Sequence, residues 1–79
     1  MRNIINQARY GKDNNGNRIR YQNRLFIKRA EELVQSLEAE ALNAADKNDY
    51  PKFTSILYEI DALNKAIADE KALIRCFQI

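Results

Sequence analysis

The chain has 79 residues, of which 46% are apolar and 30% are charged, and its formal net charge is +2. A chain of this length forms one domain at most. Its composition is typical of a soluble globular or coiled-coil protein and excludes a disordered chain. The longest apolar runs, such as Leu25 to Ile27, are too short to span a membrane, and the single cysteine, Cys76, excludes an intramolecular disulfide and a thiolate zinc site.

Charge is divided unevenly along the chain. Residues 1–29 carry eight cations and one anion, whereas residues 30–79 carry ten acids and five bases, so a segment of +7 precedes one of −5. A cationic segment beside an acidic body usually needs an anionic partner. The N-terminal third is therefore the first candidate for a binding surface. Since no hydrophobic stretch of signal-peptide length opens the chain, we expect a cytoplasmic protein.

Residues 1–17 form a basic N-terminal segment for which two structures are open. The Asp/Asn/Gly cluster at 13–17 is typical of a turn, and the residues on either side of it can pair as a small β-hairpin. Alternatively, residues 2–9 form a short helix, the asparagine-rich stretch is a loop, and Asn17 caps a following long helix. We favour the second arrangement, because an isolated two-stranded ribbon is marginal in water.

Residues 18–79 form the second unit, an all-α domain with two heptad patterns. Apolar residues at a 3.5-residue period predict helices over about 18–47 and 51–77, packed along a common seam. Because the link between them is short, the helices fold back as an antiparallel hairpin. The seam residues are Ile27, Ala30, Val34, Leu37, Ala41 and Ala44 in the first helix and Phe53, Ile56, Ile60, Leu63, Ile67, Glu70, Ile74 and Phe77 in the second.

The break between the helices has its own signals. Asn48 or Asp49 can cap the second helix, and Pro51 fits its first turn, where no intrahelical donor is lost. Proline also disfavours a helical conformation in the residue before it. The sequence therefore predicts that the first helix ends before this point.

Glu70 interrupts the apolar seam, and two interpretations are open. It can lie where the hairpin frays, reaching solvent or pairing with Arg24 or Lys28 across the open end. Alternatively, it specifies register or oligomeric state, as a buried polar residue does in some coiled coils.

The apolar stripe widens at the end of the hairpin away from the turn. A two-helix hairpin has no third layer to cover such a surface, and isolated pairs of this size are marginal. We expect a homo-oligomer, most simply a dimer that forms a four-helix bundle. Coverage by the N-terminal segment and an open groove for another protein are the alternatives. The expected oligomer or partner interface consists of Phe26, Leu33, Leu73 and Phe77.

The sequence does not favour catalysis. It contains no histidine and only two glycines, so a common general base and a glycine-rich phosphate loop are both missing. No base is spaced to activate Ser36, Thr54 or Ser55. We therefore expect a non-enzymatic protein without a metal, a cofactor or a small-molecule substrate.

The basic segment is the best functional lead. Arg20, Arg24 and Lys28 recur at every fourth residue, and such cations hold phosphates while neighbouring tyrosines stack on exposed bases. The simpler alternative is that they neutralise the acidic half of the same or a neighbouring subunit. The residues expected to bind nucleic acid or an acidic partner are Arg9, Lys12, Arg18, Arg20, Tyr21, Arg24, Lys28 and Arg29.

Two functions follow from these features. The first is a helical homo-oligomer that binds nucleic acid through its basic N-terminal third, as a regulator or architectural factor. The second is a protein-binding inhibitor, adaptor or assembly factor that docks on a larger machine through the cationic and apolar open end of the hairpin. Small helical proteins of the second class are often encoded by phages and mobile elements.

Overall fold

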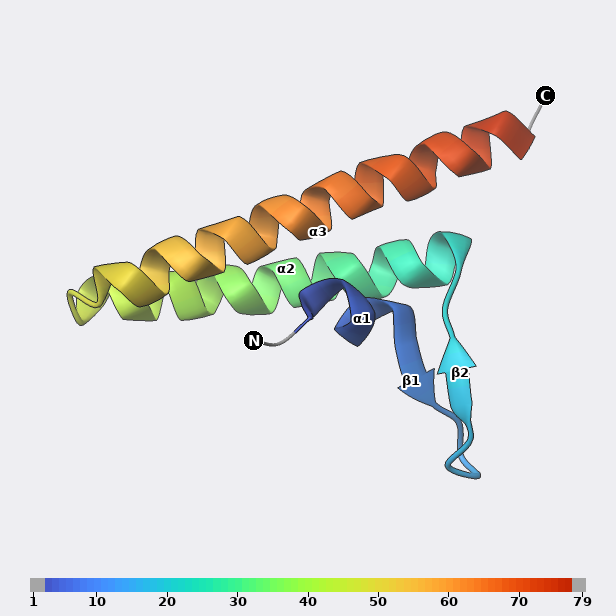
Figure 1. Cartoon of the computed structure of the whole chain (residues 1–79), viewed down its shortest axis with the longest axis horizontal. Coiled ribbons are helices and arrows are strands. Elements are labelled where there is room, and N and C mark those ends of the chain that lie inside the picture. The colour runs from blue at the N-terminus through green and yellow to red at the C-terminus, as the bar shows by residue number, and fades with distance from the viewer. Residues whose placement is uncertain (1–2, 78–79) are drawn as a thin grey trace.

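A computed structural model describes residues 3–77 and contains two long helices that lie side by side (Figure 1). These helices, α2 (Asn23–Asp46) and α3 (Tyr50–Phe77), form the antiparallel hairpin expected from the heptad patterns. A short helix α1 (Ile4–Arg9) and two three-residue strands, β1 (Tyr10–Lys12) and β2 (Arg18–Arg20), precede them. None of the helices within residues 3–77 is long and apolar enough to cross a membrane.

The predicted seam is the core of the hairpin. All six seam residues of α2 are buried, and so are Ile56, Leu63 and Ile67 of α3, with Leu63 fully inaccessible to solvent. Residues that recur at this period lie on one stripe of each helix, so burying the stripe drives the two helices together. The side chain of Phe77 lies outside the described part of the structure.

The turn between the helices uses the residues that the sequence suggested. Asn48 has a φ of 58°, and the amides of Asn48 and Asp49 donate to the carbonyls of Ala45 and Ala44 at 3.0 and 2.8 Å. This pattern of bonds around a left-handed residue terminates α2 and satisfies its last carbonyls. The Asp49 carboxylate in turn accepts from the Lys52 amide at 3.4 Å and caps α3.

The N-terminal arm, residues 3–22, combines both of the structures considered for it. A short helix is present, capped by Asn3, whose side chain accepts from the Asn6 amide at 3.2 Å. A hairpin is also present, because β1 pairs antiparallel with β2. The expected start of the long helix near residue 18 and its cap at Asn17 are therefore wrong. The strand takes residues 18–20, and α2 begins only at Asn23.

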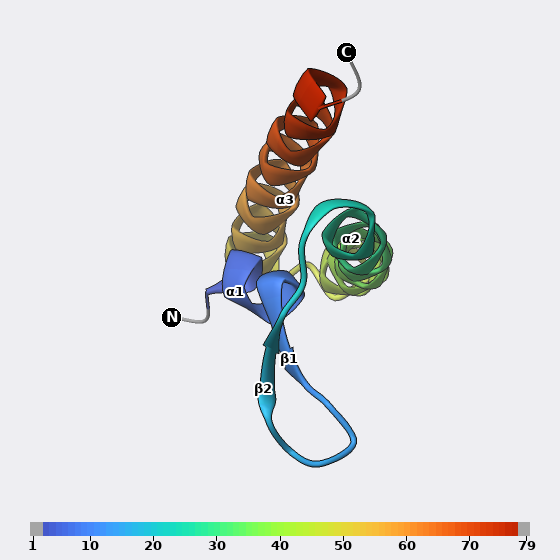
Figure 2. The same cartoon turned by 90° about the vertical axis from the view of Figure 1, so that its right-hand side faces the viewer.

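The β-ribbon formed by β1 and β2 points away from the helices. Figures 1 and 2 show it extending from the end of α1 with its turn farthest from α2 and α3. Helix α1, in contrast, packs against both long helices. The arm thus has an attached part and a projecting part.

Helix α1 covers part of the wide apolar stripe. Ile4 is 5% exposed and Ala8 is 1% exposed, and both belong to the same core as Phe26, which is fully buried. Coverage by the N-terminal segment, one of the alternatives left open, therefore occurs within the chain itself. A third layer over one face of the hairpin reduces the apolar area that an oligomer would need to bury.

Candidate nucleic-acid interface

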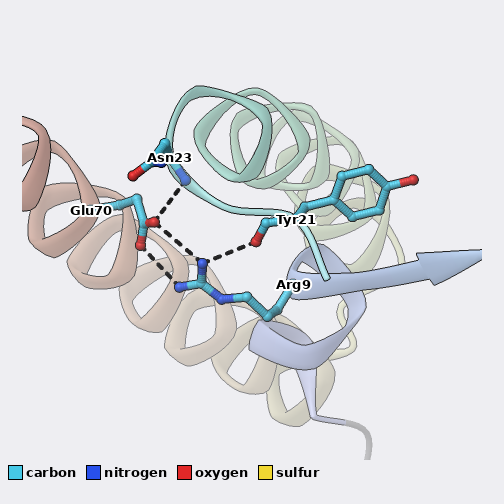
Figure 3. Close-up of polar contacts among 4 residues, drawn as sticks. All are labelled: Arg9, Tyr21, Asn23 and Glu70. Atoms are coloured by element: carbon cyan, nitrogen blue, oxygen red, sulfur yellow. Dashed lines mark hydrogen bonds and ion pairs between the residues drawn. The ribbon is translucent and has the colours of Figure 1, made fainter. Parts of the chain in front are cut away.

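An ion pair between Arg9 and Glu70 fixes the arm to α3 (Figure 3). The two guanidinium NH groups of Arg9 donate to the two carboxylate oxygens of Glu70 at 3.3 and 3.0 Å. Arg9 also donates to the Tyr21 carbonyl at 3.1 Å, and the Asn23 amide donates to Glu70 at 2.8 Å. The carboxylate therefore joins α1, the start of α2 and α3. This two-pronged arrangement is the geometry in which arginine and carboxylate bind most strongly.

Burial makes this pair a structural element. The side chains of Arg9 and Glu70 are only 17% and 8% exposed, and the Arg9 guanidinium lies 3.7 Å from the centre of the Phe26 ring. The expectation that Glu70 reaches solvent or pairs with Arg24 or Lys28 is therefore wrong. Its partner comes from the arm, because the chain before α2 folds back to place Arg9 beside α3.

The same contacts stabilise the ionised form of Glu70. The hydrogen bond from Arg9 lowers the pKa of this carboxyl, and it outweighs burial, which acts in the opposite direction. The Asn23 amide and the positive charges of Arg9 and Arg20 lower this pKa further. Asn23 starts α2, and Gln22, the residue before it, makes no capping bond with its side chain. The Glu70 carboxylate thus supplies an anion at the N-terminal end of α2, where the helix dipole favours one.

A second arginine, Arg29 of α2, holds the other side of the arm. Its side chain donates to the carbonyls of Ala8, Gln7 and Tyr10 at 3.0, 3.1 and 3.3 Å. These carbonyls lie at the end of α1 and the start of β1, where the helix leaves some of its acceptors without internal donors. Arg29 therefore completes the hydrogen bonding of this junction.

Both tyrosines of the ribbon region already stack against arginines. The Arg18 guanidinium lies 4.1 Å from the centre of the Tyr10 ring, and the Arg29 guanidinium lies 4.1 Å from that of Tyr21. Each contact is a cation–π interaction. A nucleic-acid base that stacked on the same ring face would have to displace the arginine.

The other five cations that were expected to bind an anionic partner lie on the surface of the protein. We call this set the basic surface, and it spans the ribbon and the first two turns of α2. All of its members are exposed, and none forms an ion pair with a carboxylate of residues 3–77. The basic surface consists of Lys12, Arg18, Arg20, Arg24 and Lys28.

The eight residues expected to bind an anionic partner thus separate into two groups. Five of them form the basic surface, whereas Arg9, Tyr21 and Arg29 are half-buried and hold the arm in place. The separation was not visible in the sequence, because all eight lie within one short basic stretch. The solitary Glu70 in an apolar seam was the one available signal, since a buried carboxylate requires a cationic partner.

The residues expected at an oligomer or partner interface also have different environments. Phe26 is fully buried under the arm, which removes it from any accessible contact surface. Leu33 is half-buried against the core, and Leu73 is 51% exposed. Phe77 lies outside the residues whose side chains are described.

Comparison of the chain with protein-family models, with curated proteins and with solved structures gives no match.

Proposed function

We propose that this protein is a small, non-enzymatic helical protein that binds nucleic acid through its basic surface, as a regulator or architectural factor. The observation that carries the proposal is the exposure of five cations on one contiguous stretch of chain, none of them paired with a carboxylate among residues 3–77. Unpaired cations bind a phosphate backbone favourably, because the backbone releases its bound counterions when the cations replace them.

The anchored arginines support this proposal, because they hold the basic surface in place. Arg9 and Arg29 fix the base of the ribbon to the helices, so the backbone that carries the ribbon's exposed cations is held in place before a partner arrives. A backbone that is already ordered in the free protein loses less conformational entropy on binding. A flexible basic tail lacks this advantage.

The alternative of self-neutralisation receives less support. The stretch from Ala30 to Asp46 carries five acids and no base. Within the described residues, however, the arm's one ion pair is that of Arg9 with Glu70, which lies on α3. Arg20 acts on Glu70 only through its charge, and the five exposed cations form no ion pair within residues 3–77, so they are available to another molecule.

Docking on a protein remains the second candidate, and Leu25 and Leu73 favour it. They are 61% and 51% exposed, and Leu25 adjoins Arg24 of the basic surface. Burial of Phe26 nevertheless removes an aromatic side chain from that surface. Interfaces between proteins usually depend on such large buried anchors, so the proposal keeps nucleic acid first.

Self-association and a cytoplasmic location belong to the same proposal. Exposed leucines away from the arm, Leu42 at 69% and Leu57 at 46%, give a second copy an apolar surface to bury. Sedimentation equilibrium measures the oligomeric state directly. A monomer at concentrations well above those used for binding would contradict the oligomeric part.

The test is a salt titration of binding to a DNA duplex, an RNA duplex and a single strand. We expect the logarithm of the binding constant to fall linearly with the logarithm of salt concentration. The variant Arg20→Ala/Arg24→Ala/Lys28→Ala should reduce this slope by about 0.9 for each cation removed on duplex DNA. The matched control is Lys47→Ala/Lys52→Ala/Lys65→Ala, which removes the same charge from residues outside the basic surface.

Equal slopes for the two triple variants would show that only net charge matters. Absence of binding to every probe at low salt would end the proposal. Capture of a stable protein partner after nuclease treatment would favour the second candidate instead.

A further inference from the structure

The ribbon has one cationic face and one packed face. In an antiparallel pair, residues directly opposite each other share a face, and successive residues alternate. The register pairs Tyr10 with Arg20 and Lys12 with Arg18, which places three cations and one tyrosine on the same face. Gly11 and Ile19, paired with each other, lie on the opposite face.

The packed face is turned toward α2. A Cβ atom at Gly11 would lie 2.7 Å from Cε2 of Tyr21, so the tyrosine ring rests directly on the glycine. The guanidinium of Arg29, a residue of α2, lies over the same ring. The face that carries Lys12, Arg18 and Arg20 is therefore directed away from this packing, and all three side chains are exposed.

The turn at the end of the ribbon presents amide side chains. The Asp13 carboxylate accepts from the backbone amides of Asn15 and Asn17 at 2.9 and 2.8 Å, which closes the turn. Gly16 has a φ of 83°, a value that other residues rarely adopt. Asp13 is thus used by the turn itself, while Asn14 and Asn15 are exposed at its tip.

We infer that this ribbon enters the major groove of B-form duplex DNA, with its cationic face on the phosphates and Asn14 and Asn15 toward the base edges. The inference rests on the proposed function and specifies its substrate. The major groove of B-DNA is about 12 Å wide and admits a two-stranded ribbon. Asparagine amides match the donor and acceptor pattern of adenine in that groove.

The same geometry disfavours the other nucleic acids. The major groove of an RNA duplex is too narrow and deep for side chains to read. Proteins that bind single strands use open aromatic rings as stacking platforms. The rings of Tyr10 and Tyr21 are instead stacked against Arg18 and Arg29.

The experiment compares four probes of one sequence at one salt concentration. They are a DNA duplex, the same duplex with glucosylated 5-hydroxymethylcytosine, the RNA duplex and the single DNA strand. The glucose fills the major groove without changing the backbone charge. We expect the unmodified DNA duplex to bind at least about ten-fold more tightly than each of the other three.

A charge-neutral variant tests the tip. We expect Asn14→Ala/Asn15→Ala to weaken binding to the unmodified duplex by about five-fold or more while leaving the salt slope unchanged, because base contacts are lost and phosphate contacts are kept. The control is Asn43→Ala/Asn64→Ala, which changes two exposed asparagines on α2 and α3 and should not alter binding.

The outcomes separate the two proposals. Equal binding of the unmodified and glucosylated duplexes, or preference for RNA or a single strand, overturns the major-groove inference and leaves the proposed function intact. A tip variant that binds like the wild type also overturns the inference. Absence of binding to all four probes overturns both.

Discussion

The helical hairpin and the N-terminal arm are held by different forces. Helices α2 and α3 meet along an apolar seam in which Leu37 and Leu63 are almost or fully buried. The arm, in contrast, contributes only Ile4 and Ala8 to the buried core. What fixes it is a set of hydrogen bonds from two arginines, together with guanidinium groups stacked on aromatic rings.

This difference has consequences for how each region responds to change. Apolar burial is non-directional, so a seam tolerates small shifts of its side chains. The bonds of Arg9 and Glu70 are directional and mostly shielded from water, so removing one partner leaves the other charged and buried. We therefore expect seam variants to lower the stability of the whole chain and arm variants to detach the ribbon first.

Truncation of the seam should have the largest effect. We expect Leu63→Ala to lower the free energy of unfolding by about 4 kcal/mol, because it leaves a cavity at a fully buried position. Urea denaturation followed by circular dichroism measures this change. Leu42→Ala, at a position that is 69% exposed, is the control and should change stability by no more than about 0.5 kcal/mol. Similar losses for both variants would contradict the assigned seam.

Removal of Glu70 should have the next largest effect. We expect Glu70→Ala to cost about 3 kcal/mol, because Arg9 stays buried without its partner. Hydrogen exchange should locate the loss in residues 10–22. The double variant Arg9→Met/Glu70→Leu should lose less than Glu70→Ala, because apolar side chains then replace both charges. Unchanged exchange in the ribbon would show that the ion pair does not hold the arm.

A methyl group on Gly11 should disturb the arm more mildly. We expect Gly11→Ala to cost about 2 kcal/mol, since the new Cβ would lie 2.7 Å from the Tyr21 ring and force that ring to move. Faster hydrogen exchange in β1 and β2 would accompany the loss. Lys12→Ala, an exposed neighbour, is the control and should leave both quantities unchanged. Wild-type stability in Gly11→Ala would contradict the packing of Tyr21 on the ribbon.

Acid should weaken the arm by the smallest amount. The folded pKa of Glu70 lies below its ordinary value of 4.5, so the ionised carboxylate adds stability above that pH and loses it as the pH falls through the folded value. We expect the stability difference between the wild type and Glu70→Gln to be constant from pH 7 to about 5 and to shrink below. Thermal melts across this range measure it. A difference that grows on acidification would reverse the assigned direction.

The sequence by itself determined the helical hairpin. Ile27, Val34 and Leu63 are examples of seam positions that the heptad period identified, and the structure buries all of them. The turn was equally readable, because Asn48 and Asp49 act within a few residues of their own backbone. Such signals are local or periodic, so one sequence is enough to find them.

Only the tertiary structure decided the arm and the roles of its cations. Arg9 and Arg20 look alike in the sequence, yet one is buried against Glu70 and the other is exposed. The contact between Arg9 and Glu70 joins residues 61 positions apart, and no period or spacing connects them. The sequence favoured a loop over the ribbon for the same reason. A two-stranded hairpin is marginal alone, but here the Tyr21 ring packs on Gly11 and Arg29 stacks on that ring. Directional contacts between distant residues depend on the completed fold. The apolar period that builds the hairpin, in contrast, is visible in the sequence itself.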